Sequence, residues 1–291
     1  MDWKVDEIKE LRGFTIEWAE EGNYILSRSN VLFHCASLRE LPFKKLATID
    51  APTWKAYASR FRLAQRLLRF MVTNAVPLPN GDIFVTFDKT AGIIRNGKYQ
   101  ALRGMERPCR VLRSACAVDV EGNVFFGEYL SNVERGEMRI YKYRSGSDAL
   151  EIAYTFQAGT IRHIHGIYFD PFTKNLFCLT GDDDRECRIL RTSDDFKTIE
   201  TVGEGDETWR AVSLLFAKDS IYYGMDAEFR TNNIYKLDRN TLEKQSLGEV
   251  SGTYSIQSRS ATSYFSRRRP KTPQAKPRTS PHSGMYRLMG R

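Results

Sequence analysis

The stretch SACAVDVEGNVFFG, residues 114–127, decides the fold. It holds a short apolar segment, a turn made by Glu121, Gly122 and Asn123, and an aromatic segment that ends at Gly127. β-Branched and aromatic runs bounded by turn residues predict a β-hairpin. The same plan recurs at residues 72–85, 163–180 and 211–224, each time with a turn rich in Asp, Asn, Gly or Lys.

These hairpins define a repeating unit. Successive units begin about 40 to 50 residues apart, and each leaves room for two more strands, such as 138–143 with 151–156. Four strands per unit at this period are typical of a β-propeller blade. An earlier partial unit at residues 23–33 brings the total to about five recognisable blades before residue 250. The sequence therefore predicts an all-β protein, a β-propeller whose ring is incomplete if a further blade is needed.

Charge separates the chain into two parts. The net charge is +8, but residues 251–291 contain nine Lys or Arg and no acidic residue, so residues 1–250 carry −1. The last 41 residues are also rich in Ser and Pro, and such a composition does not bury enough apolar surface to offset its ordering entropy. We expect a propeller over residues 1–250 and a disordered basic tail over 251–291. Nucleic-acid binding, which basic residues favour, is expected only weakly and through the tail.

Other features narrow the class of protein. No run of about 18 apolar residues is present, and the first residues lack the basic-then-apolar order of a secretion signal, so a cytoplasmic protein without a membrane span is the default expectation. Five cysteines without a CxxC pair indicate reduced thiols and neither a disulfide framework nor a zinc knuckle. P-loop, GxGxxG, GxSxG and HExxH motifs are absent.

Residues 54–70 interrupt the strand pattern. Tyr57, Phe61, Ala64, Leu67 and Leu68 recur at helical spacing with arginines between them. A basic amphipathic helix suits a membrane surface or a partner. A helix or distorted strand packed on the propeller is the simpler expectation.

One turn resembles a known repeat. Sialidases and related propellers of the Asp-box (BNR) type carry Ser-x-Asp-x-Gly-x-Thr-Trp in a blade turn, and Ser193, Asp195 and Thr198 match it, without the Gly and the Trp and one residue short. In that family the motif is a structural turn, so Asp195 is expected to be scaffold. The strings at 127–129, 163–166, 181–184 and 209–212 are also similar to bacterial and archaeal propellers associated with surface polysaccharides.

Arginines are the first candidate ligand-binding residues. Alignment of the units on their turns places one at the start of each first strand, Arg69, Arg113, Arg162 and Arg210. Propeller first strands line the central channel, so these guanidinium groups are predicted to converge and bind a carboxylate or phosphate. Sialidase-like propellers resemble this in holding the sugar carboxylate with an arginine cluster. The alternative is that each arginine bonds loop carbonyls or neighbouring acids.

Candidate catalytic residues follow the second strands. Glu128 with Tyr129, and Asp182, supply the carboxyl groups that glycoside hydrolysis uses, or the Tyr, Glu and Asp set that the sialidase resemblance implies. Acids beside arginines also serve simply to neutralise them. Trp209 is a candidate for stacking on a sugar ring, with packing as the alternative.

His163 and His165 are two residues apart and share one face of a strand. They are candidates for general acid/base chemistry or substrate binding, His163 as a catalytic and His165 as a ligand-binding residue. Together with Asp182 or Glu186 they also make a mixed nitrogen and oxygen set suited to a divalent metal. No cofactor is expected otherwise, and a structural role for both rings remains an alternative.

The sequence thus favours a carbohydrate-active, sialidase-like glycosidase acting on an anionic glycan or surface polysaccharide. The alternative is a non-catalytic propeller that binds a polysaccharide or a protein, since the fold serves both. The abrupt change of composition near residue 250 also leads us to expect a frameshifted or truncated reading frame, because sialidase-type propellers usually have six or more blades.

Overall fold

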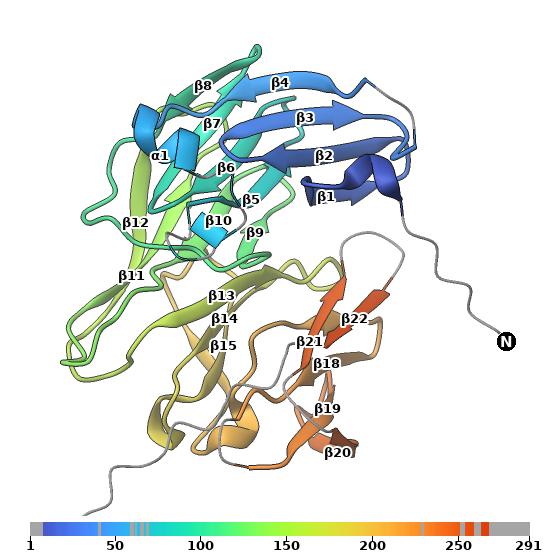
Figure 1. The fold of residues 1–291 in the computed structure, drawn as a ribbon. Coiled ribbons are helices and arrows are strands. Elements are labelled where there is room, and N and C mark those ends of the chain that lie inside the picture. Colours follow the sequence, from blue (N-terminus) through green and yellow to red (C-terminus); the bar gives the residue numbers. More distant parts are fainter. Residues whose placement is uncertain are drawn as a thin grey trace, which may run out of the picture.

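The computed structural model describes residues 8–39, 42–58, 61, 63–64, 67, 70–227, 230–250, 254–258 and 263–267, the last two ranges as backbone only. Five four-stranded antiparallel sheets follow one another along the chain, and Figure 1 shows them arranged around a common centre. In every one of these five sheets, the strands pair in the order in which they occur in the sequence. The predicted all-β propeller with about five blades is confirmed.

The strands of each blade are as follows. Blade 1 contains β1 (Thr15–Glu20), β2 (Asn23–Arg28), β3 (Val31–Cys35) and β4 (Lys44–Thr48), and blade 2 contains β5 (Val72–Pro77), β6 (Ile83–Phe87), β7 (Thr90–Arg95) and β8 (Lys98–Ala101). Blade 3 contains β9 (Cys116–Val118), β10 (Val124–Gly127), β11 (Met138–Tyr143) and β12 (Leu150–Phe156), and blade 4 contains β13 (Ile164–Phe169), β14 (Leu176–Thr180), β15 (Arg188–Thr192) and β16 (Glu200–Glu204). Blade 5 contains β17 (Leu215–Phe216), β18 (Ser220–Gly224), β19 (Asn232–Asp238) and β20 (Lys244–Val250).

Short helices and a final hairpin complete the described chain. The helices with described bounds are α1 (Thr53–Ala58) and three single 3-10 turns, η1 (Lys9–Leu11), η2 (Asp184–Glu186) and η3 (Glu207–Trp209). A two-stranded sheet, β21 (Tyr254–Ser258) with β22 (Ser263–Arg267), lies against β17 and β18. It falls inside the range predicted as a disordered tail, most of which lies outside the described residues. Within the described part, no helix is long and apolar enough to cross a membrane.

Apolar side chains fill the spaces between neighbouring blades. The core between blades 2 and 3 includes Phe84, Phe126 and Tyr143, and its counterpart between blades 3 and 4 includes Phe125 and Ile164. Because successive side chains of a strand point to opposite faces, Phe125 and Phe126 serve two different cores. This alternation allows two adjacent aromatic residues of one second strand to fill two cores.

The predicted blade turns are closed by local polar bonds. In the hairpin of residues 114–127, Asp119 Oδ1 accepts hydrogen bonds from the backbone nitrogens of Glu121 and Asn123, both at 2.9 Å. Gly122 has φ +81°, a backbone conformation that favours glycine. The turn residues thus set the register of the strands on either side.

The turn that resembles an Asp-box joins β15 to β16. Asp194, rather than Asp195, closes it, accepting bonds from Thr198 N at 2.9 Å and Thr198 Oγ1 at 2.8 Å. Asp195 instead pairs with Lys142 of blade 3 at 2.7 Å. Phe196, next in the chain, is buried between these two blades. The turn therefore has a structural role, and its local bonding differs from the match predicted from sequence.

Within residues 54–70, the described residues 54–58, 63, 64 and 67 are helical, and Phe61 lies in a bend between them. The helix α1 ends at Ala58, and the side chains of Tyr57, Phe61 and Leu67 are exposed rather than packed on the propeller. A period of about 3.6 residues places side chains on one face only while the helix is unbroken. Phe70, at the end of the segment, is buried against Phe87, with ring centroids 4.6 Å apart.

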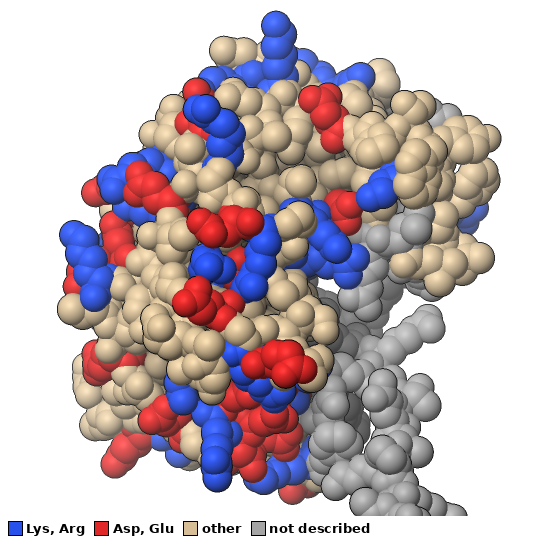
Figure 2. Space-filling view, turned by 90° about the vertical axis from the view of Figure 1, so that its left-hand side faces the viewer, with Lys and Arg blue, Asp and Glu red and all other residues tan. Residues whose placement is uncertain are grey.

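Charges of both signs are interleaved on the outer surface. Figure 2 shows this on the side of the molecule that it presents, where no extended area of the described residues has only one sign. Pairs such as Arg144 with Glu151 and Arg191 with Glu200, both at 2.7 Å, contribute to the pattern. This agrees with the near-zero net charge of residues 1–250.

Candidate functional site

The candidate site begins on the first strand of blade 4. His163 directly precedes β13, and His165 lies at a register shift between Ile164 and Gly166, where β13 holds one residue more than β14. Such a bulge redirects a side chain, and bulges are frequent beside functional sites. The two imidazole rings lie 5.1 Å apart between centroids, and both side chains are buried.

Asp182 faces both histidines from the end of β14. It follows Gly181, which has φ +87° and where a Cβ atom would overlap the backbone of Glu186, so a glycine is required at this bend. Asp182 Oδ2 lies 3.2 Å from His163 Nε2, and Asp182 Oδ1 lies 3.4 Å from His165 Nε2. These three side chains make a group whose ligand atoms all lie within 4.8 Å of one another.

The hydrogen bond of His165 defines its neutral form. Its Nδ1 lies 3.0 Å from the carbonyl oxygen of Ala211. A carbonyl only accepts, so we assign the ring proton to Nδ1. In the neutral ring Nε2 is then a bare lone pair that faces a carboxylate oxygen. Two acceptors at this distance need a proton or a cation between them.

His163 also has a buried ring nitrogen without an aligned hydrogen-bond partner in the described part of the chain. Its Nε2 is buried and makes no aligned hydrogen bond among the described residues, although the Asp182 oxygen is near. Burial lowers the pKa of His163, and the nearby Asp182 only partly opposes this effect. The ring is therefore neutral near pH 7, the form that binds metals.

Two arginines flank the carboxylate. Arg210, whose side chain is 6% exposed, donates from Nη2 to Asp182 Oδ1 at 2.8 Å. Arg162 is 37% exposed, and its Nη1 lies 3.5 Å from Asp182 Oδ2. Desolvation raises the pKa of Asp182, but the adjacent histidines and the charge of Arg210 outweigh it and hold that pKa far below its usual range. Asp182 is therefore ionised at neutral pH.

Arg162 has free hydrogen-bonding capacity. Its Nε is buried and has no partner within the described chain. Its backbone nitrogen donates to Glu186 Oε2 at 2.8 Å, and Glu186 Oε1 accepts from Arg135 Nε at 2.7 Å. The backbone of Arg162 is thus fixed while its guanidinium group reaches solvent.

Tyr129 closes one side of the group. Its ring centroid lies 4.4 Å from that of His163 and 6.4 Å from that of His165. The structure therefore brings six of the predicted residues together, and we call this set the Asp182 cluster: Tyr129, Arg162, His163, His165, Asp182 and Arg210.

Glu128, another predicted catalytic residue, turns away from the cluster. Its backbone contacts β13, but its fully buried carboxylate accepts from Arg107 Nε at 3.1 Å, Tyr141 OH at 3.0 Å and Arg139 N at 3.0 Å. All of these partners belong to blade 3 or to the loop before it. A catalytic role for Glu128 remains a prediction, on which nothing below depends.

The other predicted residues have separate contacts. Arg113 pairs with the buried Glu17 of blade 1 and donates to the carbonyl oxygen of Val72 at 2.9 Å. Trp209 stacks against Tyr223, and Lys244 Nζ lies 3.7 Å from the centroid of the Trp209 ring. Arg69 lies outside the described residues. Ligand binding by Arg69, Arg113 and Trp209 stays a prediction.

The Asp182 cluster has the spacing of a metal site. Adjacent ligands on a metal with bonds of about 2.1 Å lie about 3 to 3.5 Å apart, which matches the two contacts between histidine nitrogens and Asp182. Two imidazoles and a carboxylate suit Zn²⁺, Mn²⁺ and similar ions. The Ala211 carbonyl that orients His165 is a typical outer partner of a metal-bound histidine. Sequence reasoning missed this carbonyl, because a backbone acceptor has no residue signature.

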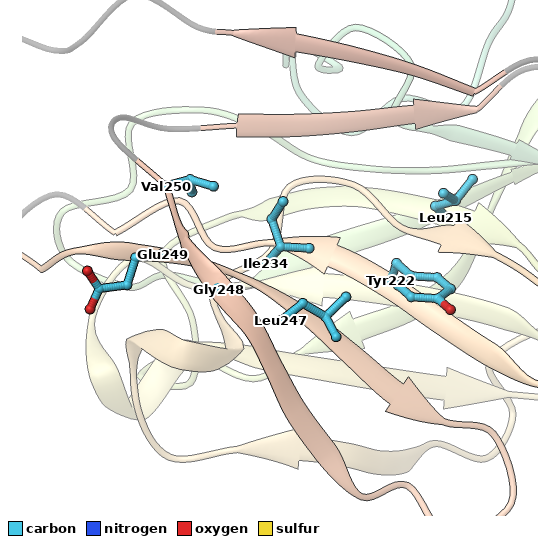
Figure 3. A pocket seen from close by; sticks show the side chains of 7 residues that line it. All are labelled: Leu215, Tyr222, Ile234, Leu247, Gly248, Glu249 and Val250. Atoms are coloured by element: carbon cyan, nitrogen blue, oxygen red, sulfur yellow. The ribbon is translucent and has the colours of Figure 1, made fainter.

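An apolar pocket lies elsewhere, on the outer face of blade 5. It has a volume of about 400 Å³, and Figure 3 shows the side chains of Leu215, Tyr222, Ile234 and Leu247 around it, with Glu249 pointing away. None of its lining residues belongs to the Asp182 cluster.

Comparison with known proteins supports the fold alone. No protein-family model matches the chain, and no curated protein matches it. It is similar to a catalytically inactive variant of virginiamycin B lyase from Staphylococcus aureus with quinupristin, with a TM-score of 0.58 and 15% identity, over 87% of this chain and 76% of that one. It is similar to an oligogalacturonate lyase in complex with manganese, with a TM-score of 0.56 and 8% identity, over 82% and 65% of the two chains.

Larger structures match over only part of their length. For an ancestral GH74 enzyme the TM-score is 0.59 and the identity 10%, over 84% of this chain and 33% of that one. For the extracellular domain of BT4673 from B. thetaiotaomicron the TM-score is 0.52 and the identity 14%, and this chain spans 28% of that length. At such identities the matches establish a β-propeller and assign no activity to it.

Proposed function

We infer that the protein is a carbohydrate-active propeller that binds an anionic glycan at the Asp182 cluster with the help of a divalent metal ion. The observation that carries this conclusion is a pair of buried histidines, His163 and His165, whose Nε2 atoms lie 3.2 and 3.4 Å from the ionised carboxylate of Asp182. A cation between these atoms satisfies all of them at once. Without one, the neutral His165 ring, whose proton is assigned to Nδ1, presents a buried Nε2 acceptor to a carboxylate oxygen, which is a costly arrangement.

Arg162 favours an anionic ligand. The Arg162 guanidinium group is 37% exposed and offers charged N–H donors of the kind that bind a carboxylate. A sugar carboxylate placed there would lie beside the metal site, since Arg162 already reaches Asp182. Arg210 is nearly buried and holds Asp182 in place, so it has a positioning role.

The chain's own groups indicate what chemistry is available. A bound divalent ion would neutralise the sugar carboxylate or lower the pKa of a bound water. Tyr129 lies against His163 at the side of the cluster, within reach of a proton transfer to or from the substrate. The described cluster contains one carboxylate rather than the pair that most glycosidases use. It therefore fits metal-assisted cleavage, by hydrolysis or by elimination next to the carboxylate, better than two-carboxylate hydrolysis.

The first experiment is to incubate the protein with acidic oligosaccharides, either with Mn²⁺ or Zn²⁺ or with a chelator. The masses of the products are then measured by mass spectrometry. Hydrolysis breaks the glycosidic bond and adds one water to the two products together. Elimination removes a proton from carbon, expels the leaving sugar and forms a carbon–carbon double bond, so the product masses sum to that of the substrate. We expect cleavage that needs the metal.

Variants then test the cluster. His163→Gln and Asp182→Asn should each reduce metal affinity by at least about tenfold in calorimetric titration. His34→Gln is the matched control, because His34 lies in β3 of blade 1 and takes no part in the cluster. Metal binding that is unchanged in both cluster variants would overturn the proposal.

A non-catalytic role is the second candidate. The observation in its favour is that the carboxylate of Glu128, another predicted catalytic residue, already accepts hydrogen bonds from Arg107, Tyr141 and the Arg139 backbone. In that case the glycan binds in a metal-dependent way and is recovered intact.

A further inference from the structure

A second surface, distinct from the Asp182 cluster, lies between blades 1 and 2. We define the docking segment as residues 53–70, which connect β4 to β5. Five of its large apolar side chains are between 60% and 76% exposed: Trp54, Tyr57, Phe61, Leu63 and Leu67. Among the described residues, the other large exposed apolar side chains are scattered one at a time through the blades. Single exposed apolar residues are ordinary, whereas a group of them marks a binding surface.

Three of the exposed side chains, Trp54, Tyr57 and Phe61, lie next to one another. Trp54 and Tyr57 are three residues apart in α1 and therefore share a face of that helix. The ring centroids of Tyr57 and Phe61 lie 6.1 Å apart. Figure 1 shows α1 beside the strand ends of blades 1 and 2.

The segment is fixed to the propeller at several points. Ser29 Oγ donates to the carbonyl oxygen of Ala56 at 3.3 Å, and Lys55 Nζ pairs with Asp88 at 3.4 Å. Phe70 is buried in the core between blades 1 and 2. The segment is thus held to the blades at Lys55, Ala56 and Phe70, while its described large apolar side chains from Trp54 to Leu67 are exposed.

Charge identifies the kind of partner. The docking segment contains five basic residues, Lys55, Arg60, Arg62, Arg66 and Arg69, and no acidic residue. Residues 1–250 have a net charge of −1, so without this segment they carry −6. A basic segment on an otherwise acidic body is attracted to an anionic surface and sets the orientation in which the molecule approaches it.

The mixture of residue types matches an interface between lipid and water. Trp, Tyr and Phe place apolar rings among lipid headgroups, and Lys and Arg keep their charges beside anionic phosphates. Each basic residue near an anionic leaflet adds to the attraction, which salt weakens. We propose that residues 53–70 dock the propeller on an anionic lipid surface.

Sedimentation with phospholipid vesicles tests this proposal. The full chain is mixed with vesicles of phosphatidylcholine alone, or of phosphatidylcholine and phosphatidylglycerol in equal parts, at low and at high salt. We expect binding to the anionic vesicles, with a partition coefficient at least about tenfold lower at high salt. The triple variant Trp54→Ser, Phe61→Ser, Leu67→Ser should bind at least about tenfold more weakly at low salt.

A matched variant controls for the loss of apolar surface. Val120→Ser with Leu247→Ser removes two exposed apolar side chains from other blades and should leave vesicle binding unchanged. Circular dichroism establishes that both variants are folded, which is expected because every substituted side chain is exposed.

Three outcomes would overturn the proposal. The first is no binding to anionic vesicles. The second is equal binding by the wild type and the triple variant, which would assign the interaction to other basic residues such as those of the C-terminal tail. The third is a dimer in solution that the triple variant converts to a monomer without any change in vesicle binding, which would make the segment a contact between two copies.

Discussion

Replacing Glu128 with glutamine is the most informative single change outside the Asp182 cluster. The carboxylate is fully buried and accepts two hydrogen bonds from Arg107, one from Tyr141 and one from the Arg139 backbone. Glutamine keeps the shape but removes the charge, and its amide nitrogen places donor against donor. Glu128→Gln should therefore destabilise the fold and leave metal binding unchanged.

The magnitude follows from these contacts. Breaking a buried ion pair costs about 3–5 kcal/mol. The Arg107 side chain is 34% exposed, so water replaces part of what it loses, and about 2–4 kcal/mol is the expected cost. For a chain of this size that corresponds to a melting temperature lower by about 5–15 °C.

Urea unfolding, followed by circular dichroism, measures this change. Glu137→Gln is the control, since Glu137 pairs with Arg139 at 3.0 Å but is 47% exposed, and it should change stability by less than about 1 kcal/mol. Glu128→Gln unfolding at the wild-type urea concentration would refute the reasoning. Wild-type stability combined with lost turnover would instead support the catalytic role that the sequence predicts for Glu128.

Three further predictions concern ligand binding, packing and pH. Arg162→Gln should raise KM for an acidic glycan by about tenfold or more, through loss of a charge-assisted bond, while Arg191→Gln on the outer edge of blade 4 should leave steady-state kinetics unchanged. Gly127→Ala should cost about 1–3 kcal/mol in urea unfolding, because the new methyl would overlap the Ile164 side chain, whereas at Gly136 the nearest atom would be 3.4 Å away and the alanine should be tolerated. Burial raises the pKa of the Cys109 thiol to about 12. A thiol whose folded pKa is raised contributes stability that is complete below its unfolded pKa of about 8.5 and is lost as the pH rises toward the folded pKa. Cys109→Ser should therefore flatten the loss of folding stability at alkaline pH. Rapid alkylation of Cys109 at pH 8 in the folded protein would contradict this prediction.

The sequence by itself determined the architecture. Aromatic pairs such as Phe125 and Phe126 next to turn residues such as Asp119 and Gly122 predict hairpins, because each strand serves two cores and each turn is closed by local bonds. Such signals lie within about 14 residues and recur, so they can be read without knowledge of distant contacts. The helical spacing of residues 54–70 did not show where the helix is interrupted, since α1 ends at Ala58 and Phe61 lies in a bend before the helical residues 63 and 64.

Only the tertiary structure decided which polar side chains meet. Arg113 and Arg162 occupy equivalent places in their blades, yet Arg113 pairs with Glu17, while Arg162 reaches Asp182. Glu128 and Asp182 likewise both follow second strands, but their carboxylates have different partners. The repeat fixes where the backbone of each residue lies. The direction of the His165 side chain depends in addition on a bulge in β13 and on the Ala211 carbonyl of the next blade. Those partners lie dozens of residues away along the chain and come together only when the blades pack side by side.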